Sequence, residues 1–101
     1  MATTFKHLKT QLGQYIGKKQ FRSMSATVYL YENGEVFVSY ATVCAIKING
    51  TLTLTTAHDY SPTTCKHLNA YTGLSTPQRR EAIANGDIEC IPSTSNASIL
   101  F

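Results

Sequence analysis

The amino-acid sequence predicts a single α+β domain. Three observations support this class: an apolar stripe with helical spacing near the N-terminus, a central stretch with two-residue alternation, and two short helices with clear start and stop signals. The expected order is an N-terminal helix, an antiparallel β-meander of three to four strands, a helix-turn-helix pair and a C-terminal edge strand. We expect residues 1–92 to form the domain and residues 93–101 to form a flexible tail.

The first helix is predicted from apolar residues that recur at spacings of three and four, which places them on one stripe: Phe5, Leu8, Leu12, Tyr15 and Ile16. Thr3 or Thr4 can cap its start, and Gly17 is a natural stop. In a small domain such a stripe usually packs on a sheet.

Two Asn-Gly pairs, Asn33–Gly34 and Asn49–Gly50, predict β-hairpins with two-residue type I′ turns. The predicted cross-strand partners are Tyr31 with Val36, Leu30 with Phe37 and Tyr29 with Val38 at the first turn, and Ile48 with Thr51, Lys47 with Leu52 and Ala45 with Leu54 at the second. Residues 36–48 are expected to form one long strand that bends near residues 39–42.

These hairpins give the predicted sheet two different faces. The aliphatic face is expected to lie under the helices and contains Val28, Leu30, Phe37, Ala41, Val43, Ala45, Leu52 and Leu54. The other face is rich in tyrosine, which favours interfaces, and its predicted protein-binding residues are Tyr29, Tyr31, Tyr40, Val36, Val38 and Ile46. Two alternatives stay open: a homodimer through this face, and an ordinary exposed strand surface, where tyrosine is also common.

The C-terminal helical pair carries the clearest local signals. The first helix is expected to begin at Ser61–Pro62 and to stop at Gly73, and the second to begin at Thr76–Pro77 and to stop at Gly86. Residues 87–91 then alternate polar and apolar side chains, which predicts a half-buried edge strand.

Charge is distributed unevenly along the chain. Residues 1–24 contain five cations and no acid, whereas the net charge of the whole chain is +3. This asymmetry supports an alternative function, a small basic nucleic-acid-binding regulator, in which Arg79 and Arg80 begin the second helix of a helix-turn-helix. The residues predicted for that role are Lys6, Lys9, Lys18, Lys19, Arg22, Lys66, Arg79 and Arg80.

No catalytic, cofactor or metal-binding motif is present in the sequence. It lacks a glycine-rich phosphate loop, a paired acidic motif and a serine elbow, so a non-enzymatic protein without a cofactor is expected. His58, Cys65, His67 and Cys90 lack the short spacing of zinc ligands. The three cysteines, with Cys44, are expected to be reduced thiols, at least two of them buried.

The chain is expected to be soluble and intracellular. Its apolar runs are all shorter than the roughly 20 residues that a transmembrane helix needs. Lysines interrupt the apolar positions of the first 19 residues, which does not fit a signal peptide. No membrane partner is therefore predicted.

The segment DYSPTTCKHLN, at residues 59–69, resembles a pattern in small uncharacterised accessory proteins of tailed bacteriophages. The resemblance extends over Leu52 to Ile91, and Pro62 and Cys65 depart from the pattern. It implies an accessory phage protein in the host cytoplasm. Such a protein would bind and modulate a host protein, as an inhibitor or anti-defence factor, or bind nucleic acid.

Overall fold

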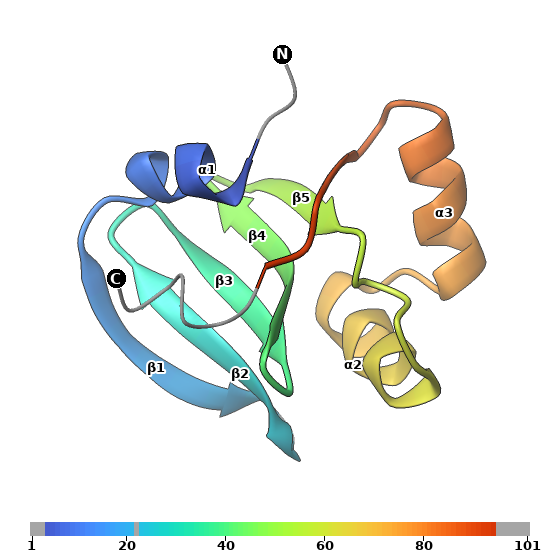
Figure 1. The fold of residues 1–101 in the computed structure, drawn as a ribbon, viewed down its shortest axis with the longest axis horizontal. Helices are drawn as coiled ribbons and strands as arrows, with labels where there is room; N and C mark the ends of the chain where they lie inside the picture. Colours follow the sequence, from blue (N-terminus) through green and yellow to red (C-terminus); the bar gives the residue numbers. More distant parts are fainter. Residues whose placement is uncertain (1–3, 22, 95–101) are drawn as a thin grey trace.

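The computed structural model describes residues 4–21 and 23–94 of the chain (Figure 1). The helices and strands follow one another in the order α1 (Phe5–Leu12), β1 (Tyr15–Phe21), β2 (Ser23–Tyr31), β3 (Gly34–Ser39), β4 (Thr42–Ile48), β5 (Thr51–Thr55), α2 (Pro62–Thr72), α3 (Thr76–Ala84) and β6 (Glu89–Ile91). The predicted α+β class is confirmed.

All six described strands form one mixed sheet in the order β1-β2-β3-β4-β5-β6. The first five strands pair antiparallel as a meander, and β6 pairs parallel with β5. A parallel pair requires a crossover connection, and α2 and α3 supply it between β5 and β6. The prediction of three to four meander strands is therefore too low, and the short C-terminal strand does lie at an edge.

The first helix is shorter than predicted. Thr4 caps its start by accepting a hydrogen bond from the backbone N–H of His7, and Gly13 ends it with a φ of 80°. Tyr15 and Ile16, predicted to belong to the helical stripe, instead begin strand β1. The helical spacing of these two residues was coincidental, because the chain leaves the helix at a glycine that takes a positive φ without penalty.

The turn between β2 and β3 contains Glu32 and Asn33, one residue earlier than predicted. Tyr31 therefore faces Gly34 instead of Val36, and each β2 residue pairs two positions away from its predicted partner. Because side chains alternate between the faces of a sheet every residue, a shift of two leaves them on their expected faces. The C-terminal end of α1 holds this turn in place: the N–H of Asn33 donates to the carbonyl of Leu12, and the N–H of Glu32 to that of Gln14. The prediction failed because it considered only local turn chemistry.

The predicted long strand from residue 36 to residue 48 is two strands. They are joined by a two-residue turn, Tyr40–Ala41, and paired with each other. A bulge at Cys44 interrupts the ladder between the pairs Phe37–Ala45 and Val38–Val43. The extra residue exchanges the expected positions of Val43 and Cys44, so Val43 joins the tyrosine side of the sheet and Cys44 the opposite side.

The second hairpin matches its prediction in full. Ile48 faces Thr51 and Ala45 faces Leu54. Asn49 and Gly50 have φ angles of 50° and 84°, as a type I′ turn requires.

Each face of the sheet is covered by helix, so the domain has two apolar clusters (Figure 1). The cluster under α1 contains Phe5, Leu8, Leu12, Tyr29, Tyr31, Val36, Val38, Val43, Ile46 and Ile91. The cluster on the side of α2 and α3 contains Ala26, Val28, Phe37, Cys44, Ala45, Leu54, Ala57 and Leu68, with Tyr71 and Ile83 packed against it. Because α1 covers the tyrosine side, the sheet has no large apolar face open to solvent over the described residues.

The caps of α2 agree with the sequence, whereas the start of α3 differs by one residue. Ser61 accepts a hydrogen bond from the N–H of Thr64, and Gly73 ends α2 in the left-handed conformation. Ser75, not Thr76, caps α3 and forms a capping box with Gln78.

Two further expectations concern the membrane and the tail. Within residues 4–21 and 23–94, no helix is long and apolar enough to cross a membrane. Most of the predicted flexible tail, residues 95–101, lies outside the described residues, although the N–H of Val43 donates to the carbonyl of Thr94.

Candidate functional site

A small pocket lies beside the turn that joins β3 and β4. It has a volume of about 110 Å³ and is lined by Ser39, Tyr40, Thr42, Cys44, Ala57, Tyr60 and Thr64. Three separate segments therefore meet around it: the β3–β4 hairpin, the loop after β5 and the first turn of α2. Its size suits one small side chain of a partner rather than a cofactor.

Two exposed tyrosines flank this pocket. Tyr40 is 61% exposed and Tyr60 is 84% exposed. Tyr40 has a φ of 58°, which is uncommon for a bulky residue and costs about 1–3 kcal/mol. The hairpin therefore holds Tyr40 in a strained conformation that directs its ring outward beside the pocket.

Two hydroxyl groups of the pocket lining, those of Ser39 and Thr64, are hydrogen-bonded to each other and to polar side chains next to the pocket. Ser39 Oγ lies 3.2 Å from Thr64 Oγ1 and 3.1 Å from His67 Nδ1. Ser61 Oγ donates to Thr64 Oγ1 over 3.1 Å. The ring of Tyr40 lies 6.5 Å from the ring of His67, between centroids, so this polar group lies next to the exposed Tyr40.

The buried thiol of Cys44 forms part of the lining. Burial raises the pKa of Cys44 to about 11, so the group is a neutral thiol at pH 7. Two acceptors lie within reach of its single S–H, the carbonyls of Thr42 and Ala57, at 3.5 and 3.6 Å from Sγ. A neutral thiol in such surroundings is a poor nucleophile and packs as a small apolar group.

All three cysteines are free, but only Cys44 is buried. Cys65 and Cys90 are half-buried, which corrects the prediction that at least two thiols are buried. Cys65 lies on α2 and interacts with Arg79, and Cys90 lies on the edge strand β6.

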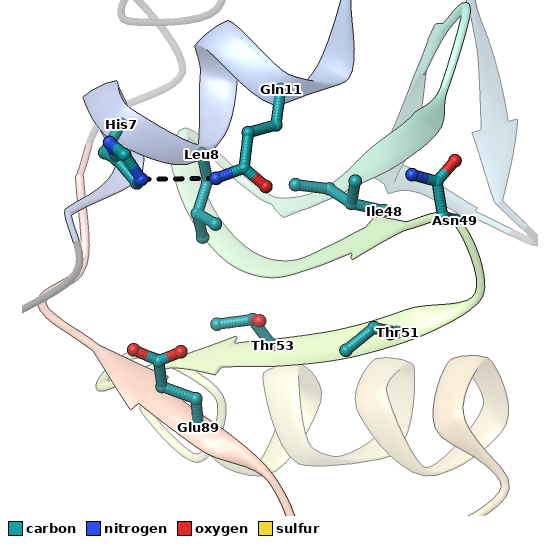
Figure 2. A pocket seen from close by; sticks show the side chains of 8 residues that line it. All are labelled: His7, Leu8, Gln11, Ile48, Asn49, Thr51, Thr53 and Glu89. Carbon is teal, nitrogen blue, oxygen red and sulfur yellow. Dashed lines mark hydrogen bonds between the residues drawn. The ribbon is translucent and has the colours of Figure 1, made fainter.

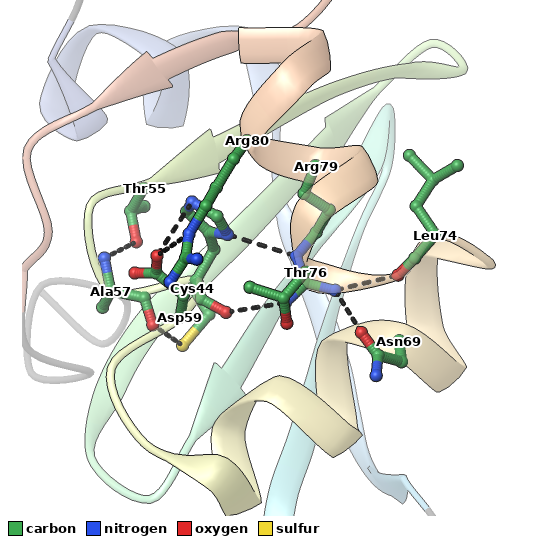
Figure 3. A network of polar contacts seen from close by, with 10 residues as sticks. Cys44, Thr55, Ala57, Asp59, Asn69, Leu74, Thr76, Arg79 and Arg80 are labelled. Carbon is green, nitrogen blue, oxygen red and sulfur yellow. Dashed lines mark hydrogen bonds and ion pairs between the residues drawn. The ribbon is translucent and has the colours of Figure 1, made fainter. Parts of the chain in front are cut away.

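Arg79 anchors the loop that carries Tyr60 (Figure 3). The guanidinium is fully buried, and all five of its N–H groups have acceptors. Nε donates to His58 Nδ1 at 3.1 Å; Nη1 donates to Asn69 Oδ1 and the Leu74 carbonyl; Nη2 donates to the His58 carbonyl and Thr76 Oγ1. One side chain thereby joins the loop after β5 to α2 and α3.

The imidazole of His58 completes this network as a neutral group. Its Nδ1 accepts from Arg79, which places the proton of neutral His58 on Nε2, 4.0 Å from Asp59 Oδ2. Burial lowers the pKa of His58, Asp59 opposes that shift, and Arg79 and Arg80 add to it. Asp59 also pairs with Arg80 Nε at 2.9 Å.

The structure corrects the predicted protein-binding face. Five of its six residues are between 0% and 6% exposed: Tyr29, Tyr31, Val36, Val38 and Ile46. They are core residues, because Phe5, Leu8 and Leu12 of α1 pack on them. The sixth, Tyr40, is exposed because it lies in the β3–β4 turn rather than in a strand of the sheet.

The predicted nucleic-acid residues do not form one surface. One group lies on α1 and β1: Lys6, Lys18 and Lys19 are exposed there, and Lys9 is half-exposed. The other group, Lys66 on α2 and Arg80 on α3, is exposed on the helices that cover the opposite face of the sheet. Arg79 is buried inside the domain, so it cannot begin a DNA-reading helix. Arg22 lies outside the described residues.

A second, larger pocket separates α1 from the β5–β6 edge (Figure 2). Its volume is about 400 Å³, and it is lined by His7, Leu8, Gln11, Ile48, Asn49, Thr51, Thr53 and Glu89. His7 Nε2 lies 3.2 Å from Gln11 Nε2 across its α1 wall. Among the described residues, no group of three or more His, Cys, Asp or Glu side chains could hold a metal ion.

Sequence reasoning missed Tyr60 and both pockets. The only local signal for Tyr60 is its place just before the helix-starting pair Ser61–Pro62, which exposes it at a loop end. The pockets depend on segments distant in sequence, so no local pattern could reveal them.

Comparisons with known proteins give one match. No curated protein and no solved structure matches this chain. Residues 16–86, from β1 to the glycine after α3, match the model of a family of unknown function, DUF8033. The match includes the β3–β4 turn, the loop with Tyr60 and the buried Arg79, and it covers more than half of the sequence; the chain therefore belongs to the DUF8033 family.

Proposed function

We propose that this chain is a non-enzymatic protein-binding domain that contacts its partner through the Tyr40–Tyr60 surface, defined as these two tyrosines and the pocket between the β3–β4 turn and α2. The observation that carries the proposal is that two of the most exposed aromatic side chains flank one small pocket. Tyrosine beside a pocket that can take a partner's side chain is typical of the centres of protein interfaces.

The rigidity of this surface supports the proposal. Tyr40 is held by a two-residue turn in a strained backbone conformation, and the Tyr60 loop is anchored by the bonds between Arg79 and His58. A preorganised surface loses less conformational freedom on binding than a mobile one. Strain retained at an exposed aromatic residue is a frequent property of functional sites.

The biological setting we propose follows from the resemblance over residues 52–91. In that setting the domain is a tailed-phage accessory protein that binds and modulates a host protein in the host cytoplasm, as an inhibitor or anti-defence factor. It requires no cofactor. A second copy of the chain could occupy the same surface as a homodimer.

A capture experiment tests the proposal. Tagged protein is incubated with nuclease-treated lysate of a bacterial host, and the retained proteins are compared with those held by Tyr40→Asn combined with Tyr60→Ser. Asparagine tolerates the positive φ of residue 40, so this variant removes both rings without disturbing the turn. We expect retention of a specific partner to fall about tenfold or more.

Glu81→Gln provides the matched control, because Glu81 is exposed on α3 away from the pocket. A partner held equally by wild type, control and double variant would contradict the proposal. Sedimentation of the purified protein distinguishes a homodimer from a complex with a different protein.

The alternative function, a small basic nucleic-acid-binding regulator, rests on the exposed lysines Lys6, Lys18 and Lys19 in a region without acidic residues. Their contacts would be made to phosphates, so binding would be independent of sequence and would weaken steeply with salt. Binding to a host protein in nuclease-treated lysate should be far less sensitive to salt.

A further inference from the structure

Strand β1 forms one edge of the sheet (Figure 1). Over the described residues the only strand that it pairs with is β2, so the outer side of residues 15–20 presents backbone N–H and C=O groups for pairing. None of its seven residues is buried, and Ile16 is 66% exposed. An edge of this length can accept a further strand by backbone hydrogen bonding.

The charge of β1 limits what that strand can be. Lys18 pairs with Tyr29, on the α1 side of the sheet, and Lys19 pairs with Val28, on the other side. The edge therefore carries one exposed positive charge on each face. The nearest acidic residue along the chain is Glu32, beyond the end of β2, so no acid on β1 or β2 neutralises these lysines.

A second copy of the chain is a poor occupant of this edge. Antiparallel self-pairing centred on β1 would place Lys18 directly opposite Lys18 of the other copy, and like charges in opposed positions are destabilising. Edge lysines are a common device against self-association of this kind. An extended segment with two adjacent acidic residues would instead be attracted to this edge. Each acidic side chain would lie opposite one lysine on the same face of the sheet.

Ile16 adds an apolar contact next to the lysines. It has no partner on β2, because the register skips from Tyr15 to Gly17, so it is the extra residue of a bulge. We propose that β1 binds an extended acidic segment of a partner protein as an added strand, with Lys18 and Lys19 selecting adjacent acidic residues and Ile16 contacting an apolar neighbour. This site is separate from the Tyr40–Tyr60 surface and does not depend on it.

The experiment uses the full chain and three capped hexapeptides. The acidic probe is Thr-Val-Glu-Glu-Val-Thr; the basic probe has two lysines in place of the glutamates; the third is the acidic probe with N-methyl groups on alternate backbone nitrogens. We expect the acidic probe to bind about tenfold or more tightly than the basic probe at low salt. Its binding should slow hydrogen exchange of the amides in residues 15–21, and N-methylation should abolish that protection.

Charge reversal supplies the decisive variant. Lys18→Glu combined with Lys19→Glu should reverse the preference between the two probes, so that the basic probe binds more tightly than the acidic probe. Lys66→Glu on α2 is the matched control and should leave the preference unchanged, because Lys66 is exposed on another element. Both lysines of β1 are exposed, so thermal unfolding of the variant should remain close to that of the wild type.

Three results would each overturn the proposal. The first is no binding of the acidic probe at millimolar concentration. The second is binding of the N-methylated probe as tight as that of the acidic probe, or no protection of β1. The third is an oligothymidine that displaces the acidic probe and binds more tightly than it does, which would assign the basic edge to nucleic acid.

Discussion

The backbone of Lys47 occupies the space into which a side chain on Gly34 would project. A Cβ atom on Gly34 would lie 2.9 Å from the carbonyl carbon of Lys47 and 3.0 Å from Cα of Ile48. Gly34 pairs directly with Ile48 at the start of β3, and its φ is not positive. Glycine is therefore required there by the close approach of β4, not by turn conformation.

This contact predicts different effects for two glycines that the sequence presents as equivalent. Gly34→Ala should lower the free energy of unfolding by about 3 kcal/mol, because backbone atoms must move apart. Gly50→Ala should lower it by about 1 kcal/mol, since Gly50 has a φ of 84° but open space around it. Urea denaturation of both variants measures the difference, and equal losses would mean that β3 and β4 are not this close.

Arg79 should be much more important for stability than its neighbour Arg80. Arg79→Lys should lower the free energy of unfolding by about 3 kcal/mol, because an ammonium group cannot reach all five acceptors and leaves buried oxygens unpaired. The control is Arg80→Lys. Arg80 is 62% exposed, so its pair with Asp59 should contribute less than about 1 kcal/mol. Similar denaturation midpoints for the two variants would show that Arg79 is not buried.

The lowered pKa of His58 predicts a dependence of stability on pH. As pH falls through 6.5, the ordinary value, the unfolded chain takes up a proton that folded His58 does not. Stability should therefore decrease as pH falls from about 7 through the folded-state pKa of His58. The pKa of Asp59 is also lowered, from its ordinary value of 3.8. Asp59 should therefore cause a second loss of stability as pH falls below 3.8 toward its folded-state pKa.

His58→Asn tests this dependence. Asparagine retains an acceptor near the position of Nδ1 but does not titrate. Thermal or urea unfolding between pH 5 and pH 7, roughly, should show a weaker pH dependence in the variant. An unchanged slope would assign the titration to another group.

The burial of Tyr29 and the exposure of Tyr40 predict opposite effects of removing each ring. Tyr29→Ser should lower the free energy of unfolding by about 3 kcal/mol, because it opens a cavity beneath α1. Tyr40→Asn should leave stability unchanged or raise it by about 1 kcal/mol, since asparagine adopts positive φ more readily. Differential scanning calorimetry of the two variants makes the comparison, and a large loss for Tyr40→Asn would mean that the ring of Tyr40 packs on the fold.

Some features of the candidate site could be read from the sequence and others could not. Tyr40 was predicted as a binding residue, but as a member of a flat tyrosine face rather than of a turn. The turn itself was hidden because Tyr40–Ala41 contains neither glycine nor asparagine, the residues that normally take positive φ. Tyr60 and the pocket depend on the meeting of three distant segments.

By itself, the sequence determined those features whose interactions lie within a few residues. The caps of α2 at Ser61 and Gly73 and the turn at Asn49–Gly50 depend on local hydrogen bonds and φ preferences, which the residue types settle. Tertiary structure decided the turn at Glu32–Asn33, the burial of Arg79 and the covering of Tyr29 and its neighbours by α1. Each of these depends on a partner distant along the chain, and only the packed fold determines which helix covers which face of the sheet.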